Sequence, residues 1–223
     1  PAAPHLNGSG ETFEYAVKMR QFPPDATLDR LDAAGGMTAQ HIEAIAAVLA
    51  RFHTEGCARA GQDSPWGSPD AIWDPVAQNF VRIAAHLDDP ADRAQLDALR
   101  RWSETEHIRL APLMAARKAD GFVRECHGDL HLGNLAWVDG RLLVFDCIEF
   151  NPELRWIDIQ SEVAFCYMDL LQRGHVEWAW LFLNTWLEQT GDYAGLALLR
   201  YYAVYRALVR AKIAAIRTAQ TAG

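Results

Sequence analysis

Six polar side chains lie between apolar runs in the stretch ECHGDLHLGNLAWVDGRLLVFDCIEF, residues 125–150. They are His127, Asp129, His131, Asn134, Asp146 and Glu149. Amide and carboxylate oxygens are the ligands that Mg²⁺ takes in proteins, usually sharing the ion with water and substrate phosphates. Two histidines beside an aspartate can instead hold Zn²⁺. Which chemistry applies depends on which of these side chains the fold brings together.

The dipeptide Asp139-Gly140 separates the apolar runs NLAWV and RLLVFDC, a pattern that predicts a β-hairpin with a type I′ turn. A tight hairpin brings its two ends together, so we expect Asn134 and Asp146 to be neighbours, with Asp129 beside them. Asn134 and Asp146 would then bind Mg²⁺. Asp129 would remain free to accept the proton of an attacking hydroxyl.

The spacing of these residues matches the phosphotransfer template of protein kinases, in which a catalytic aspartate precedes an asparagine by five residues and a metal-binding aspartate follows a further strand. HGDLHLGN has this spacing, with Gly128 where protein kinases have arginine, and FDC stands where DFG carries its aspartate. Over residues 120–165 the sequence resembles the aminoglycoside phosphotransferase and choline kinase-like family.

The resemblance implies a role for each matching residue. Asp129 would be the catalytic base, His127 would support its loop, and Asn134 and Asp146 would hold Mg²⁺. Asp158 takes the place of a second aspartate of the family, which braces the catalytic loop. His131 and Glu149 receive no role from the resemblance.

The implied fold is α+β and mostly helical: the large, C-terminal lobe of a protein kinase-like fold, with a small β-hairpin carrying the catalytic loop. Residues 1–24 would be the last strand of the small lobe and the hinge, with the backbone near Met19, Arg20 and Phe22 meeting the adenine. Residues 25–223 would be the large lobe. NGSGETFEYAVKM could be read as a glycine-rich loop with its lysine, but eight positions from Gly10 to Lys18 are too few for two strands. We therefore expect most of the small lobe to be missing, and the isolated chain to bind ATP weakly or not at all.

Helical periodicity and breaker residues predict the remaining elements. Helices are expected from Thr38 to about Gly56 and over 75–87, 91–119, 156–172, 175–189 and 192–219, with a strand over 122–126. Glu104, Glu106, Glu162 and Asp169 are expected on solvated helix faces, and His53 at the surface or the edge of the core. Trp156, Trp178, Trp180 and Trp186 are expected to pack in the core.

Composition narrows the class of protein. The formal net charge is −8 and no Lys/Arg-rich run occurs, so a nucleic-acid partner is not expected. No apolar run is long enough to span a membrane. Cys57, Cys126, Cys147 and Cys166 form no C-x-x-C pair, which favours reduced, buried thiols in a cytoplasmic protein.

The leading hypothesis is an ATP- and Mg²⁺-dependent phosphotransferase that moves the γ-phosphate to a hydroxyl of a small molecule. Two alternatives stay open: a non-catalytic binding or regulatory module of the same fold, and a metal-dependent hydrolase using His127, Asp129 and His131. The stretch FDCIEFNPELRWIDIQSEVAF further resembles bacterial proteins that join this domain to a P-loop ATPase-like domain. No P-loop motif occurs in the 223 residues, so that domain would be a covalently linked partner in the full-length protein.

Overall fold

The computed structural model describes residues 11–12, 15, 18 and 21–221, and this part of the chain is mostly helical. Its helices are α1 (Leu28–Ala33), α2 (Ala39–Arg51), α3 (Pro69–Ala84), α4 (Pro90–Ala119), α5 (Pro152–Arg155), α6 (Ile159–Gln172), α7 (Val176–Thr190) and α8 (Leu196–Thr221). Short helical turns are η1 (Pro24–Ala26), η2 (Phe52–Gly56), η3 (Leu132–Asn134) and η4 (Tyr193–Gly195). The strands are β1 (Val123–Glu125), β2 (Leu135–Val138), β3 (Arg141–Val144) and β4 (Trp156–Asp158).

The predicted hairpin is confirmed. Strands β2 and β3 pair antiparallel with Leu135 opposite Val144, so the two strand ends next to Asn134 and Phe145 lie together. Asp139 (φ 50°) and Gly140 (φ 73°) both adopt positive φ, as a type I′ turn requires. The turn residues therefore set the register that brings the polar cluster together.

A second two-stranded ladder was not predicted. Residues 156–158, expected to begin a helix, form β4 and pair antiparallel with β1, with Val123 opposite Asp158 and Glu125 opposite Trp156. The helix α6 starts only at Ile159, because the Asp158 side chain caps it by accepting the Gln160 N–H at 2.9 Å. The loop from residue 126 to residue 134 thus runs between two ladders, leaving β1 and entering β2.

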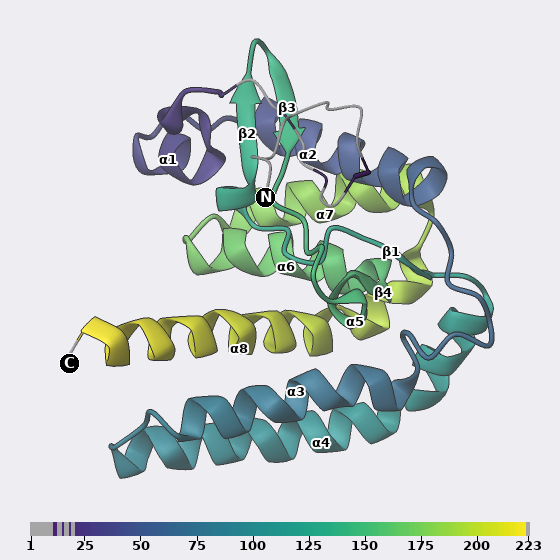
Figure 1. Cartoon of the computed structure of the whole chain (residues 1–223), viewed down its shortest axis with the longest axis vertical. Helices are drawn as coiled ribbons and strands as arrows, with labels where there is room; N and C mark the ends of the chain where they lie inside the picture. The colour runs from purple at the N-terminus through teal and green to yellow at the C-terminus, as the bar shows by residue number, and fades with distance from the viewer. Residues whose placement is uncertain (1–10, 13–14, 16–17, 19–20, 222–223) are drawn as a thin grey trace.

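Helix α6 is the centre of the core. Every residue from Ile159 to Leu170 is buried, as expected for a helix surrounded by other elements. It packs against α7 and α8, α2 packs against α7, and α3 contacts α4 and α8. Figure 1 shows α8 between α6 and the antiparallel α3–α4 pair, with the β2–β3 hairpin at the opposite end of the molecule. Trp186 is fully buried as predicted, whereas Trp180 is 49% exposed.

Most helix boundaries agree with the sequence pattern. Helix α2 starts after Thr38, which forms a capping box with His41, and the helical path ends at Gly56. Helix α3 begins at Pro69 rather than at residue 75, because Ser68 caps it by accepting the Ala71 N–H. Within the described residues, no helix combines the length and the apolar character needed to cross a membrane.

The last small-lobe strand and the hinge, expected within residues 1–24, fall largely outside the described residues, as do Met19 and Arg20. Phe22 is described, and its ring lies edge-on against Phe145 with centroids 5.1 Å apart. Thr27 forms an isolated antiparallel bridge with Ala136 on β2. The segment that precedes α1 therefore contacts both strands' side of the hairpin: Phe22 packs on Phe145, the residue before Asp146, and Thr27 pairs with β2.

Candidate functional site

Gly128 anchors the loop 126–134 to the core through both of its backbone polar groups. Its N–H donates to Glu162 Oε1 at 2.9 Å, and its carbonyl accepts from the Arg206 guanidinium at 3.0 Å. The residue has φ 86°, and a Cβ there would lie 2.6 Å from the Leu154 carbonyl oxygen. Glycine is therefore required at this position by conformation and by space.

Glu162, the partner of Gly128, is itself held by a buried chain of hydrogen bonds. Its Oε2 lies 2.7 Å from His53 Nε2, and Trp186 Nε1 lies 3.2 Å from His53 Nδ1. Because an indole nitrogen can only donate, Nδ1 accepts and the imidazole carries its proton on Nε2, facing Glu162. Burial by itself raises the pKa of Glu162, but the hydrogen bonds from His53 and the Gly128 amide outweigh it and hold the pKa below its usual value. An ionised carboxylate thus fixes the start of the loop.

Asp129, the next residue, presents its carboxylate at the surface with 36% of the side chain exposed. Asn134 Nδ2 donates to the Asp129 carbonyl oxygen at 2.9 Å and to Oδ2 at 3.1 Å. His131 Nε2 lies 3.5 Å from the same Oδ2. His131 Nδ1 accepts the Gly133 N–H, so the ring proton sits on Nε2 and faces Asp129.

These partners set the charge state of Asp129. Partial burial raises the pKa of its carboxyl, but the hydrogen bond from His131 and the positive charge of Arg206 bring the pKa below its usual value. Asp129 is therefore ionised at neutral pH. Oδ2 is occupied by donors from the protein, so Oδ1 is the oxygen through which this carboxylate can meet a ligand.

His127 joins the loop to the far end of the hairpin. Its Nε2 lies 2.7 Å from the Phe145 carbonyl oxygen, and its Nδ1 accepts the Asp129 N–H at 3.3 Å. Phe145 N–H donates to the Asn134 carbonyl at 3.1 Å. Both polar groups of the Phe145 backbone are thus fixed, and they position Asp146, which is exposed and has φ 61°. The predicted meeting of the Asn134 and Asp146 ends is confirmed for the backbone.

The amide of Asn134 is oriented by its bonds to Asp129, which leaves its oxygen, Oδ1, as the atom that could bind a cation. Together with the Asp146 carboxylate this gives two oxygen donors of the kind that Mg²⁺ prefers. A magnesium ion held by such oxygens usually completes its shell with water and a phosphate.

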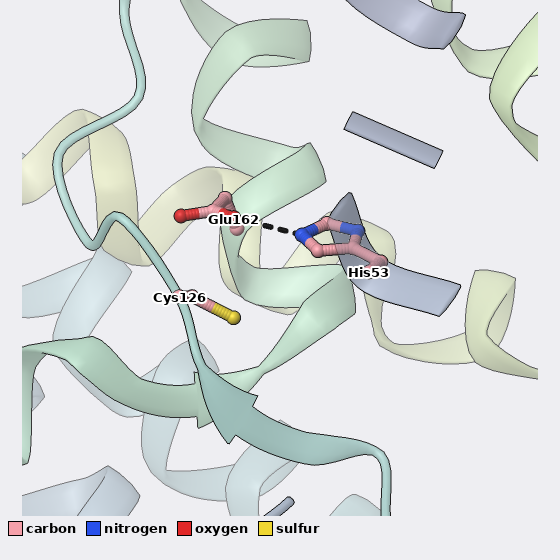
Figure 2. A group of neighbouring side chains, drawn as sticks. All are labelled: His53, Cys126 and Glu162. Atoms are coloured by element: carbon pink, nitrogen blue, oxygen red, sulfur yellow. Dashed lines mark hydrogen bonds and ion pairs between the residues drawn. The ribbon is translucent and has the colours of Figure 1, made fainter. Parts of the chain in front are cut away.

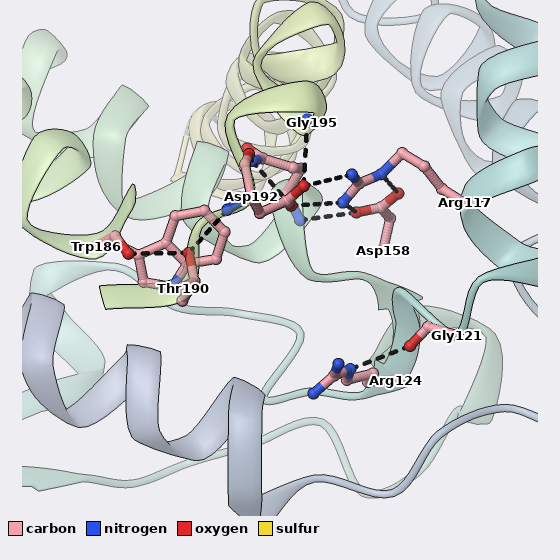
Figure 3. Close-up of polar contacts among 9 residues, drawn as sticks. Arg117, Gly121, Arg124, Asp158, Trp186, Thr190, Asp192 and Gly195 are labelled. Carbon is pink, nitrogen blue, oxygen red and sulfur yellow. Dashed lines mark hydrogen bonds and ion pairs between the residues drawn. The ribbon is translucent and has the colours of Figure 1, made fainter. Parts of the chain in front are cut away.

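Asp158 has a different role from the one that the sequence suggested. Figure 3 shows its carboxylate, together with that of Asp192, around the guanidinium of Arg117. Arg117 reaches Asp158 at 2.7 and 2.9 Å and Asp192 at 2.7 Å through two nitrogens, and all three side chains are almost completely buried. Burial lowers the pKa of Arg117, but the bonds to both carboxylates reverse this and raise it. Asp158 therefore ties α4 to the start of α6.

The loop is braced instead by Glu162 and Asp169, which were predicted on solvated faces. That prediction was wrong: Glu162 is 1% and Asp169 0% exposed, and Asp169 Oδ2 accepts the Leu132 N–H at 3.0 Å. His53, expected at the surface or core edge, is completely buried. The sequence did contain a signal for this burial: apolar residues surround Glu162 and Asp169 on all sides of the helix. Such a helix is buried, and a polar side chain within it must have a hydrogen-bond partner.

A group of possible metal ligands among the described residues, His53, Cys126 and Glu162, has its ligand atoms within 4.8 Å of one another (Figure 2). It does not suit a metal. Both His53 nitrogens are committed, one as acceptor from Trp186 and one as donor to Glu162. Burial also raises the pKa of the Cys126 thiol well above its usual value, which disfavours the thiolate that binds metals.

The hydrolase alternative requires His127 and His131 as zinc ligands. His127 uses Nε2 on the Phe145 carbonyl and Nδ1 on the Asp129 amide, and His131 uses Nδ1 on the Gly133 amide. A zinc ion would have to replace the bonds that hold this loop. The committed ring nitrogens therefore argue against a zinc site built from these two histidines.

An apolar groove of 690 Å³ lies behind the loop. It is bounded by α2, η2, the hairpin and residues 147–149. Its lining includes His127 but not Asp129, Asn134 or Asp146, so it backs the candidate site rather than containing it. Cys147, predicted to be buried, is exposed at the groove, whereas Cys126 and Cys166 are buried as predicted, and all four cysteines are free.

No family model matches the chain. Uncharacterized proteins of Mycobacterium bovis and Mycobacterium tuberculosis are 30% identical to it over 217 residues, which cover 97% of this chain and 43% of each relative. The chain thus spans less than half the length of these curated relatives. A glucosamine kinase, solved in complex with glucosamine, ADP and inorganic phosphate, superposes with a TM-score of 0.50 and 18% identity over 87% of this chain and 53% of that one. At this identity the likeness shows a shared fold.

Proposed function

We propose that these residues form the catalytic, large-lobe part of an ATP- and Mg²⁺-dependent phosphotransferase that acts on a hydroxyl of a small molecule. The observation that carries the proposal is the arrangement around Asp129. An ionised carboxylate is oriented through Oδ2 by Asn134 and His131, and lies on a loop that His127 ties to the residue preceding Asp146. The motif HGDLHLGN and its resemblance to the aminoglycoside phosphotransferase and choline kinase-like family support the same assignment.

The chemistry requires one proton transfer and one phosphoryl transfer. The acceptor hydroxyl donates its hydrogen bond to Asp129 Oδ1 and loses its proton to this carboxylate as its oxygen attacks the γ-phosphorus of ATP. The bond from the γ-phosphorus to the bridging oxygen breaks, and ADP leaves with that electron pair. Asn134 and Asp146 would hold Mg²⁺, which neutralises phosphate charge when bound. The protein contributes mainly position and charge.

The acceptor class is a small hydroxylated molecule. The solved kinase of similar fold binds glucosamine and ADP, so an amino sugar is the first acceptor to test in a screen of hydroxylated compounds. The free cysteines and the absence of basic runs favour a cytoplasmic enzyme without a nucleic-acid partner. The remaining length of the relatives leaves room for the nucleotide-covering lobe and for a linked P-loop domain.

The decisive experiment is the Asp129→Asn substitution in the full-length protein. We expect Mg²⁺-dependent ATP turnover to fall about 10²–10⁴-fold, because the amide cannot accept the hydroxyl proton. The matched control is Asp139→Asn in the hairpin turn, where asparagine tolerates positive φ equally well and activity should be unchanged. Normal turnover by the Asp129 variant would refute the proposal, and a folded protein without nucleotide affinity would favour the binding module.

A further inference from the structure

Arg206 on α8 is a buried cation that no carboxylate neutralises. Its side chain is 2% exposed, and within the part of the chain that the structure describes it forms no ion pair. Its acceptors are all neutral: the Ser161 carbonyl at 3.1 Å, the Ser161 hydroxyl at 2.9 Å and the Gly128 carbonyl at 3.0 Å. Buried charges normally have a counter-charge, because removing an ion from water is costly. Packing alone does not account for such a group.

Arg117 shows the usual arrangement in the same core. Its side chain is 3% exposed and is paired with two carboxylates, those of Asp158 and Asp192. The fold thus neutralises this guanidinium twice and leaves Arg206 with carbonyl and hydroxyl oxygens. Such oxygens carry only partial charges, so the positive potential of Arg206 extends beyond the atoms that it contacts.

The guanidinium of Arg206 is held in one orientation. Its Nε and Nη2 bind the two oxygen atoms of Ser161 on α6, and its central carbon lies 5.1 Å from the centroid of the Phe165 ring and 4.9 Å from that of Tyr205. Aromatic faces attract a cation without neutralising it. Since a guanidinium is planar and its donors point in fixed directions, fixing Nε and Nη2 also fixes Nη1. Nη1 is the nitrogen that reaches the Gly128 carbonyl.

Nη1 acts on the peptide that joins Gly128 to Asp129. The carbonyl of this peptide accepts from Arg206, and its N–H, which belongs to Asp129, donates to His127 Nδ1 at 3.3 Å. A peptide unit is planar, so bonds at both of its ends fix its rotation. That rotation sets the direction in which the Asp129 side chain leaves the backbone. The positive charge of Arg206 also acts on the Asp129 carboxyl itself.

We propose that Arg206 is a positioning residue for the phosphoryl transfer. It fixes the plane of the 128–129 peptide and, as a cation behind the loop, holds the Asp129 carboxylate in the direction of the acceptor hydroxyl. Glu162 binds the N–H of Gly128 and Arg206 binds its carbonyl, so an anion from α6 and a cation from α8 anchor one residue. The inference rests on the proposed function for the role of Asp129, and on these buried contacts for the role of Arg206.

Arg206→Ala in the full-length protein tests the proposal. We expect kcat for ATP-dependent transfer to fall about 10–100-fold, because a misdirected base slows the chemical step, and KM for ATP to change less than about threefold. Arg206→Lys keeps the charge but replaces the planar fork by one ammonium group, and it serves if the alanine variant does not fold. Its kcat should lie between those of the wild type and the alanine variant. A wild-type kcat per folded molecule, or a loss confined to KM, would overturn the proposal.

Chemical rescue separates the charge from the space that the side chain fills. Arg206→Ala leaves room between the Phe165 and Tyr205 rings for a free guanidinium ion, and millimolar guanidinium should restore part of kcat. Urea has the same planar shape and similar N–H donors but no charge, so the same concentration of urea should restore none. Equal rescue by urea and by guanidinium would overturn the role given to the charge.

Hydrogen exchange separates positioning from a general loss of stability. By mass spectrometry, the amides of residues 126–134 should exchange faster in Arg206→Ala, whereas those of α3 should exchange at the wild-type rate. Faster exchange throughout the molecule would show an ordinary core residue and would overturn the proposal. The matched control is Arg200→Ala on the same helix, whose guanidinium lies 5.2 Å from the Trp102 ring centroid. It should change neither kcat nor exchange in the loop.

The proposed function and the role of Arg206 can fail separately. Asp129→Asn should remove turnover and leave exchange in residues 126–134 slow. An inactive Asp129→Asn beside a fully active Arg206→Ala would refute the role of Arg206 alone. A wild-type protein without transfer activity would refute the proposed function, and with it the role of Arg206 in the transfer, even if Arg206→Ala frees the loop.

Discussion

At the scale of single residues, the site is defined by which side-chain atoms remain available. Asn134 and His131 take Oδ2 of Asp129, and His127 is committed at both ring nitrogens. What remains is one carboxylate oxygen, one amide oxygen and the Asp146 carboxylate. Hydrogen bonding within the protein thus leaves a different free oxygen on the residue proposed to receive a proton and on each residue proposed to bind a cation.

His131→Ala tests the orientation of Asp129. Removing the Nε2–H donor leaves Asn134 as the remaining partner of Oδ2, so the Asp129 carboxylate is less well oriented. We expect kcat to fall roughly tenfold, less than for loss of the proposed base itself. KM for ATP should change little, because His131 faces the carboxylate rather than the nucleotide. His131→Gln, which can restore an N–H donor, should recover part of kcat, and steady-state kinetics of the full-length protein measure both. An unchanged kcat in the alanine variant would remove His131 from the site.

Glu162→Gln tests the buried brace. The carboxylate accepts bonds from His53 and Gly128, and replacing a buried charged acceptor by a neutral amide should lower the free energy of unfolding by about 2 kcal/mol at pH 7. The folded pKa of Glu162 lies below its usual value of 4.5, so its stabilisation is present above that pH and is lost as the pH falls through the folded pKa. Urea unfolding at pH 7 and below pH 4.5 should therefore show a difference between the variant and the wild type that shrinks with acid. A difference independent of pH would contradict an ionised Glu162.

At the scale of elements, two short antiparallel ladders hold the two ends of the loop 126–134. The β1–β4 ladder fixes where the loop begins, and the β2–β3 hairpin fixes where it ends. Gly128 lies in between with both backbone groups bonded to α6 and α8 through Glu162 and Arg206. The loop is thus positioned by helices far from it in sequence.

Gly128→Ala and Gly140→Ala form a matched pair. Both glycines have positive φ, so alanine strains the backbone at each by about 1–2 kcal/mol. A Cβ at Gly140 has open space around it, whereas at Gly128 it meets the Leu154 carbonyl at 2.6 Å. We expect the Gly128 variant to be clearly less stable in thermal or urea unfolding and to lose activity, and the Gly140 variant to show only the strain. Equal destabilisation by the two would mean that the crowding at Gly128 is relieved by a small shift.

At the scale of the whole molecule, the α3–α4 pair lies on the side of α8 away from α6, and a buried charged triple secures α4 to the core. Arg117 on α4 binds Asp158 at the start of α6 and Asp192 just before α8. One side chain therefore holds together three parts of the chain that are distant in sequence (Figure 3).

Arg117→Met should destabilise the protein by about 3–5 kcal/mol, because two carboxylates would remain buried without a cation. The exposed pair of Arg100 and Glu104 supplies the control, and Arg100→Met should leave the unfolding midpoint unchanged. Denaturant titration of the three proteins measures the effect. A loss no larger than that of the control would show that the triple contributes no net stability.

The sequence alone determined the local features. The Asp139-Gly140 turn predicted the hairpin, Thr38 predicted the start of α2, and the spacing of Asp129, Asn134 and Asp146 predicted that these residues converge. Each depends on backbone conformation over a few residues, where turn chemistry and capping act directly. The roles proposed for those residues are still predictions.

Only the tertiary structure decided which polar residues are buried and what they hold. Glu162, Asp169 and His53 were predicted at the surface or the core edge because their hydrogen-bond partners lie far away along the chain. Asp158 was predicted to support the catalytic loop because it occupies a motif position of the similar family. Strand β4 was not predicted because three residues are too few to show an alternating pattern. It is a strand only through its pairing with β1, which is distant in sequence. Burial and long-range pairing are properties of the packed chain, and a local pattern contains neither.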